Sequence, residues 1–105
     1  MSTKKFVFRV FAYKEADETY TAVCLDLDIV EENHQSLQQA VLSINEAVDS
    51  HFKTAAKLGF PRELIHRPAP KPYWNKLKEL TSPTPRPLTP FQYFTTQENH
   101  GRPYA

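Results

Sequence analysis

The prolines of this chain are confined to its second part. All nine lie at or after Pro61, and the first sixty residues contain none. Because proline removes a backbone donor and interrupts both helices and strands, the longest regular elements are expected before it. The sequence therefore predicts one α+β domain over residues 1–80, with its main body at 4–60, and a Pro-rich, aromatic tail over 81–105.

Alternating apolar and polar residues predict three strands in the proline-free part. These are expected at residues 5–13 and 19–25, with a short third strand at 29–31. The segments between them are short and polar, as in connections between neighbouring antiparallel strands. The pattern therefore predicts an antiparallel meander.

A long helix is predicted to follow, over residues 36–58. Ser36 is a suitable N-cap, and Gln39 completes a capping box three residues later. Gly59 supplies the residue that commonly ends a helix, and Pro61 prevents continuation. The helix has one apolar stripe, formed by Leu37, Ala40, Val41, Ile44, Ala47, Val48, Phe52 and Ala55.

The segments after this helix are shorter. Residues 63–67 are predicted as a fourth, edge-type strand, and residues 73–80 as a short helix. The run at 82–87 favours polyproline II structure or disorder. The aromatic residues Phe91, Tyr93 and Phe94 follow, with no evident core partner in the sequence.

The fold class expected from these elements is α+β. It consists of a three- to four-stranded, mainly antiparallel sheet, one long helix on one face, and a Pro-rich C-terminal extension. The second face of the sheet is too apolar to remain open to water. Three covers are compatible with it: the C-terminal part of the chain, a second copy, or a partner. This face carries Val7, Phe11, Tyr13, Thr21, Val23 and Leu25.

Composition excludes several classes of protein. Only two glycines are present, so a glycine-rich phosphate loop is not expected, and the single cysteine excludes an internal disulfide framework. The first residues lack the apolar segment of a signal peptide, and no apolar run approaches the length of a membrane span. We therefore expect a cytoplasmic protein that does not act at a membrane.

Charge is unevenly divided along the chain. Residues 1–57 carry six Lys/Arg and nine Asp/Glu, a net charge of −3, whereas residues 58–105 carry seven Lys/Arg and three Asp/Glu, a net charge of +4. A general nucleic-acid binder would concentrate basic charge on its folded part. The acidic half instead suits a basic protein partner.

Two segments resemble the HicB-like antitoxin family. One is Tyr20-Thr21-Ala22-Val23-Cys24-Leu25-Asp26-Leu27-Asp28-Ile29-Val30, which is similar to that family's second strand and its aspartate-leucine turn. The other is Ser36-Leu37-Gln38-Gln39-Ala40-Val41, followed by Asn45-Glu46-Ala47-Val48, which resembles the family's helix. The resemblance covers about residues 5–58. His34 stands where the family usually has glycine, and Gln38 and Gln39 replace its usual acidic pair.

The resemblance implies a truncated RNase-H-like fold and a non-catalytic role. Members of the family bind and block a small basic mRNA-cleaving toxin, which is therefore the partner that the resemblance implies here. Many members also carry a C-terminal helix-turn-helix or ribbon-helix-helix segment that binds DNA. No such segment is visible after Gly59, so DNA binding is not expected. The alternative is an orphan relative that acts as a homo-oligomeric scaffold without a toxin.

The predicted contacts to a partner are four carboxylates and two aromatic anchors. The acidic turns would attract a basic partner, and the apolar strand face would anchor it. We expect no catalytic residue, no metal and no cofactor, and we expect a homo-oligomer. The predicted contact residues are Phe11, Tyr13, Asp26, Asp28, Glu31 and Glu32.

Three catalytic or metal-binding alternatives are weaker. Asp26 and Asp28 are spaced for one face of a strand, as in a two-metal nuclease, but no further carboxylate is linked to them. Cys24 with His51 and Asp49 would be a nucleophilic set, although a cysteine in an alternating strand is usually a small buried hydrophobe. A zinc site would draw on His34, His51, His66 and His100, whose spacing matches no compact zinc motif.

Overall fold

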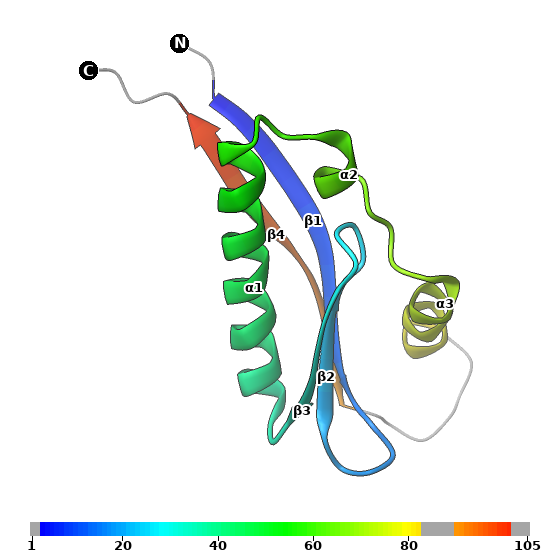
Figure 1. Ribbon diagram of the computed structural model, residues 1–105. Coiled ribbons are helices and arrows are strands. Elements are labelled where there is room, and N and C mark those ends of the chain that lie inside the picture. Colours follow the sequence, from blue (N-terminus) through cyan, green and yellow to red (C-terminus); the bar gives the residue numbers. More distant parts are fainter. Residues whose placement is uncertain (1–2, 83–89, 102–105) are drawn as a thin grey trace.

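The protein is an α+β domain in the computed structural model, which describes residues 3–82 and 90–101. This confirms the predicted class, with an antiparallel sheet and one long helix (Figure 1). The elements in chain order are β1 (Thr3–Lys14), β2 (Tyr20–Cys24), β3 (Ile29–His34), α1 (Leu37–Lys57), α2 (Arg62–Ile65), α3 (Lys71–Leu80) and β4 (Phe91–Gly101).

The sheet has four strands in the order β3-β2-β1-β4, and every neighbouring pair is antiparallel. The predicted three-strand meander is present as β1, β2 and β3. The longest pairing joins β1 to β4, from Thr3 opposite Gly101 to Tyr13 opposite Phe91. The first and last strands of the described chain are therefore neighbours in one sheet.

The prediction of a strand at residues 63–67 is wrong. Residues 62–65 form the short helix α2, which follows directly from Pro61 with φ −58°. Proline presets the backbone for a helix start, and Arg, Glu and Leu favour helix over strand. The fourth strand is β4 instead, whose residues include the β-favouring Phe91, Tyr93 and Phe94.

Residues 91–101 thus belong to the sheet, although the sequence placed them in a tail. Phe94 lies opposite Val10 and packs against the core on the α1 side, so this one residue of the three clustered aromatics has a core partner. The pattern did not reveal this pairing because the two strands are far apart in the sequence. The prediction of polyproline II structure at 82–87 falls outside the described residues, apart from Ser82.

Helix α1 begins and ends as predicted. The Ser36 hydroxyl accepts a hydrogen bond from the Gln39 amide at 3.1 Å, and the Gln39 side chain accepts one from the Gln35 amide at 3.1 Å. Gly59 follows the helix with φ +81°, in the left-handed region that glycine adopts without strain. Before the helix, Asn33 takes φ +65°, so the turn does not require a glycine at His34.

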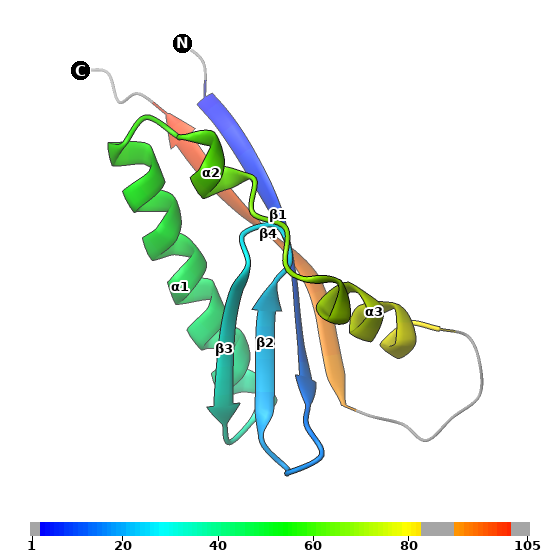
Figure 2. The ribbon, with the colours of Figure 1, turned by 45° about the vertical axis from the view of Figure 1, so that its right-hand side comes forward.

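Two core clusters pack on opposite faces of the sheet. On one face α1 covers Phe8, Val10 and Ala12 of β1. On the other face α3 covers Phe11 and Tyr13 of the same strand, and the two helices lie on opposite sides of the sheet (Figure 2). The second face is therefore covered by the chain itself, one of the three covers expected. Its helical contacts are Tyr73, Trp74, Leu77 and Leu80.

Within the described ranges, none of the helices has the length and apolar character needed to cross a membrane.

Candidate functional site

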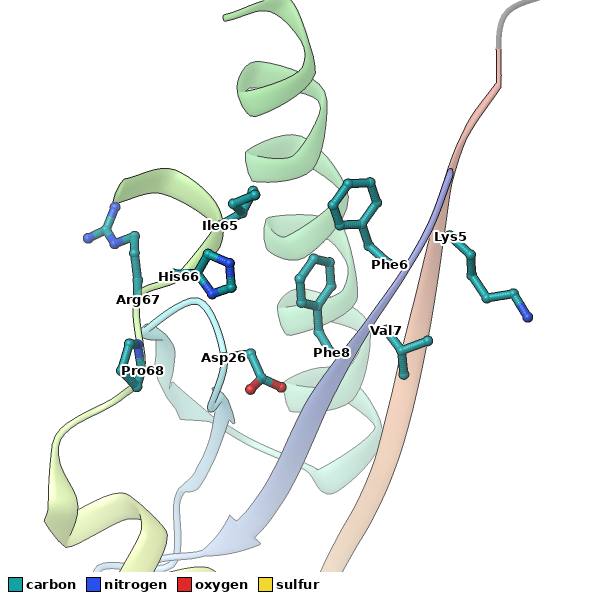
Figure 3. Close-up of a pocket in the computed structure, with 9 residues that line it drawn as sticks. All are labelled: Lys5, Phe6, Val7, Phe8, Asp26, Ile65, His66, Arg67 and Pro68. Carbon is teal, nitrogen blue, oxygen red and sulfur yellow. The ribbon is translucent and has the colours of Figure 1, made fainter. Parts of the chain in front are cut away.

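A groove opens where β2 ends and β1 continues. It has a volume of about 440 Å³, and its walls are residues 5–8 of β1 and residues 65–68, with Asp26 between them (Figure 3). Four consecutive residues of one strand line it. Because neighbouring side chains of a strand point to opposite faces, such a groove opens onto the backbone edge of the strand.

The edge of β1 in this groove has no neighbouring strand among residues 3–82 and 90–101. Pairing between β1 and β2 ends at Val10 opposite Cys24, and one further bond runs from the Leu25 amide to the Arg9 carbonyl at 2.8 Å. Backbone groups alternate in direction along a strand. The amide and carbonyl groups of Lys5 and Val7 therefore point to the same side as those of Arg9, which is the groove.

The opposite wall of the groove is held in place by the end of β2. The Arg67 amide donates to the Asp26 carbonyl at 3.2 Å, and the Ala69 amide donates to the Leu25 carbonyl at 2.8 Å. The Trp74 indole donates to the Ala69 carbonyl at 2.9 Å, which links this wall to α3. Both walls of the groove are therefore fixed by hydrogen bonds to other elements.

Asp26 closes one end of the free edge. Its Oδ2 accepts the Arg9 amide at 2.7 Å, in the place where a neighbouring strand would offer a carbonyl. Its Oδ1 accepts from the Arg9 guanidinium at 2.6 Å. Burial disfavours the carboxylate, but the hydrogen bonds from Arg9 outweigh it and lower the pKa of Asp26 below its usual value.

Replacement of this carboxylate is expected to destabilise the protein in a pH-dependent way. The pKa of Asp26 is lowered on folding, so the ionised carboxyl adds to the free energy of unfolding when the pH is above its unfolded pKa of about 3.9. This added stability is lost as the pH falls through the pKa that Asp26 has in the folded chain. Arg9 is half exposed, so we expect Asp26→Asn to reduce the free energy of unfolding by only about 1–2 kcal/mol at pH 7. Urea unfolding at pH 7 and at pH 2.5 tests this.

The matched control is Asp28→Asn, two residues away in the same turn. Asp28 is exposed with φ +54°, a conformation that asparagine also tolerates, so little change is expected. An Asp26→Asn protein that is equally destabilised at both pH values would contradict the role of the charged pair.

A second depression, of about 320 Å³, lies at the other end of the β2–β3 hairpin and is acidic. It is lined by the carboxylates of Glu15, Asp17 and Glu32, and by no lysine or arginine of the described ranges. The Thr21 hydroxyl donates to Glu15 at 2.8 Å and the Thr19 hydroxyl donates to Asp17 at 2.6 Å. The Thr19 hydrogen bonds lower the pKa of Asp17. Two of the three carboxylates are therefore held in position by threonines.

The four predicted carboxylates do not form one surface. Glu32 lies in the acidic depression, whereas Asp26 is paired with Arg9 at the groove. Asp28 is exposed in the turn before β3. Glu31 accepts a hydrogen bond at 2.6 Å from a serine of α1. Glu15 and Asp17 were missed because the turn that carries them is distant in the sequence from Glu32.

The two predicted aromatic anchors are not on an open surface, which corrects their expected role. Phe11 is 0% exposed and Tyr13 is 5% exposed, beneath α3. Their rings stack on each other with centroids 5.2 Å apart. Burial, and then the nearby Glu15, raises the pKa of the Tyr13 hydroxyl. In the folded chain these rings contact α3, which occupies the face that a partner would need.

The outer edge of β4 is another unpaired strand edge in the described part of the chain. Phe91 and Tyr93 project from this strand and are 37% and 43% exposed. Natural proteins usually protect such an edge with charges or prolines, and residues 91–97 contain neither.

The residues of the catalytic and metal alternatives are not brought together. Within the described ranges no three His, Cys, Asp or Glu side chains form a group that could hold a metal ion. Cys24 lies in the core, where burial raises the pKa of its thiol to about 11, so it is not an activated thiolate. The ring of His51 is 2.6 Å from the Leu64 carbonyl, and Asp49 pairs with Lys53.

No protein-family model, curated protein or solved structure matches the chain.

Proposed function

We propose that this protein is a non-catalytic, cytoplasmic protein-binding module of the antitoxin type, which neutralises a small basic toxin by covering it. The observation that supports this proposal is the acidic depression formed by Glu15, Asp17 and Glu32. Three carboxylates line one hollow, and no lysine or arginine of the described residues lines it. A basic partner would place positive charge beside them, so the surface is electrostatically complementary to such a protein.

The fixed orientation of the depression favours recognition of a partner. Thr19 and Thr21 hold two of its carboxylates, so less side-chain freedom is lost when a basic surface arrives. The long-range field of the carboxylates also accelerates encounter with a positively charged protein. Occlusion of this kind requires contact alone and no reacting group.

Charge reversal tests the depression. The chain is first used to isolate a basic partner from its native lysate, and the purified pair is then measured by calorimetry. We expect the double variant Asp17→Lys/Glu32→Lys to bind the partner about 100-fold more weakly than the wild type. We also expect the affinity of the wild-type complex to fall as the salt concentration rises. Both side chains are exposed, so the variant is expected to fold.

The control for charge reversal is Glu46→Lys/Glu63→Lys, which changes the net charge equally at exposed positions outside the depression. If this control weakened binding as much as the test variant, a local site would be excluded. Recovery of no stoichiometric basic protein would contradict the toxin-binding proposal as a whole.

A second candidate function is a homo-oligomeric scaffold without a toxin. It is favoured by the free β4 edge with its exposed Phe91 and Tyr93. Thr95 lies opposite Arg9, whose backbone groups face β2, so the Thr95 amide points outward from β4. We expect Thr95→Pro to convert a dimer to a monomer in light scattering without loss of fold. A wild-type monomer at all concentrations would exclude this candidate.

A further inference from the structure

We propose that the groove between residues 5–8 and residues 65–68 binds an extended peptide with alternating acidic and apolar residues, which joins the sheet as a strand beside β1. The proposal concerns a different surface from the acidic depression and goes beyond the function proposed above. It rests on the free backbone edge, the side chains on its two sides and their charge.

The backbone of the groove offers the hydrogen bonds of a strand. Lys5 and Val7 direct their amide and carbonyl groups into it, and a neighbouring strand would satisfy both residues. Recognition by strand addition gains its affinity from such main-chain bonds. Asp26 caps the Arg9 amide at 2.7 Å and so marks where the added strand must stop.

The side chains of β1 determine the chemistry of the occupant. Phe6 and Phe8 lie on the α1 side of the strand, and Lys5 and Val7 lie on the other side (Figure 3). Residues directly opposite each other on neighbouring strands share a face. A peptide in the groove would therefore place its apolar side chains on the face of Phe6 and Phe8. The side chains that alternate with them would lie on the opposite face, which carries Lys5.

The charge around the groove favours acidic side chains at those alternate positions. Lys5 and Arg67 are exposed, and neither forms an ion pair with any side chain that the structure describes. The one carboxylate of the lining, Asp26, is already neutralised by Arg9. The groove thus has an excess of positive charge, and cross-strand pairs of opposite charge stabilise a sheet.

A synthetic peptide of this pattern tests the proposal on the full chain. The probe is acetyl-VEVEVEV-amide, compared with acetyl-VKVKVKV-amide and with an acidic peptide that is N-methylated at alternate residues. Binding is followed by calorimetry. We expect the acidic probe to bind, the lysine peptide to bind at least about tenfold more weakly, and the N-methylated peptide to lose binding.

Two protein variants locate the site. Lys5→Glu places a like charge beside the acidic probe and is expected to weaken binding by about tenfold or more. Lys78→Glu makes the same change of charge on the exposed side of α3, away from the groove, and is expected to leave binding unchanged. Equal effects of the two variants would show general electrostatic attraction and would overturn the proposal.

Amide hydrogen exchange measures directly whether the backbone amides of the free β1 edge are protected. In the free protein the Lys5 and Val7 amides are expected to exchange fast, whereas the Phe6 and Phe8 amides, which face β4, are expected to be protected. The acidic probe should then protect Lys5 and Val7 alone.

Two exchange results would overturn the proposal. Binding without protection of Lys5 and Val7 would place the peptide elsewhere. Protection of both amides in the free protein that disappears on dilution would show that a second copy fills the groove. Neither result depends on the acidic depression, so failure here is distinguishable from failure of the proposed toxin binding.

Discussion

A chain that ends at Leu80 is expected to lose cooperative unfolding, because it lacks β4. The β1–β4 ladder joins Thr3–Lys14 to Phe91–Gly101, and β4 is the partner of β1 over its first residues. At about 0.5 kcal/mol for each net hydrogen bond, a ladder of this length contributes roughly 5 kcal/mol, comparable to the whole stability of a small domain. Urea unfolding followed by circular dichroism provides the measurement.

The control for the truncation is a matched pair of proline variants in the full chain. Thr96 lies opposite Phe8 and directs its amide to β1, so Thr96→Pro removes a ladder bond and should lower the free energy of unfolding by about 1–3 kcal/mol. Thr95→Pro removes an outward-facing amide and should cost much less. A chain ending at Leu80 that unfolds cooperatively at an unchanged midpoint would show that residues 1–80 fold independently.

Removal of the Phe11 ring is expected to have the second large effect. Phe11 is 0% exposed and packs with Tyr13, Val23 and Leu25 beneath α3. A Phe→Ala change at such a site removes buried apolar area and leaves a cavity, so Phe11→Ala should lower the free energy of unfolding by about 3–5 kcal/mol. Equilibrium unfolding in urea measures this difference.

Val7→Ala is the control on the same strand and the same face. Val7 is 52% exposed and does not belong to the core cluster beneath α3. Val7→Ala should therefore lower the free energy of unfolding by less than about 1 kcal/mol. If Phe11→Ala lowered the free energy of unfolding as little as Val7→Ala, α3 would not be packed on the sheet. Phe11 would then be available on an open face, as the sequence predicted for a partner anchor.

The acidic depression and the groove are separate and have opposite charge. Glu15 and Asp17 lie in the turn that precedes β2 and Glu32 lies in β3, whereas Lys5 and Arg67 belong to the groove beyond the end of β2. One chain could therefore contact two chemically different surfaces, a basic protein face and an acidic extended segment. The separate charge-reversal variants Asp17→Lys/Glu32→Lys and Lys5→Glu distinguish the two contacts.

Local patterns in the sequence determined most of the secondary structure. Apolar residues alternate every two positions in β1 and β2, and they recur every three or four positions in α1. These patterns depend only on which side of each element is buried, so they can be recognised in the sequence of a single element. Ser36 and Gly59 mark the ends of α1 because capping involves only neighbouring residues. The apolar second face of β1 likewise predicted a cover, which α3 provides.

Only the tertiary structure decided which distant segments meet. The pairing of β4 with β1 joins segments that are far apart in the sequence, and the neighbouring positions of Glu15 and Glu32 depend on the register of the β1–β2–β3 meander, so no local pattern encodes them. The groove exists because β2 ends at Cys24 while β1 extends back to Thr3. Both candidate sites therefore arise from strand lengths and register, which are set when the sheet assembles, and not from a contiguous motif.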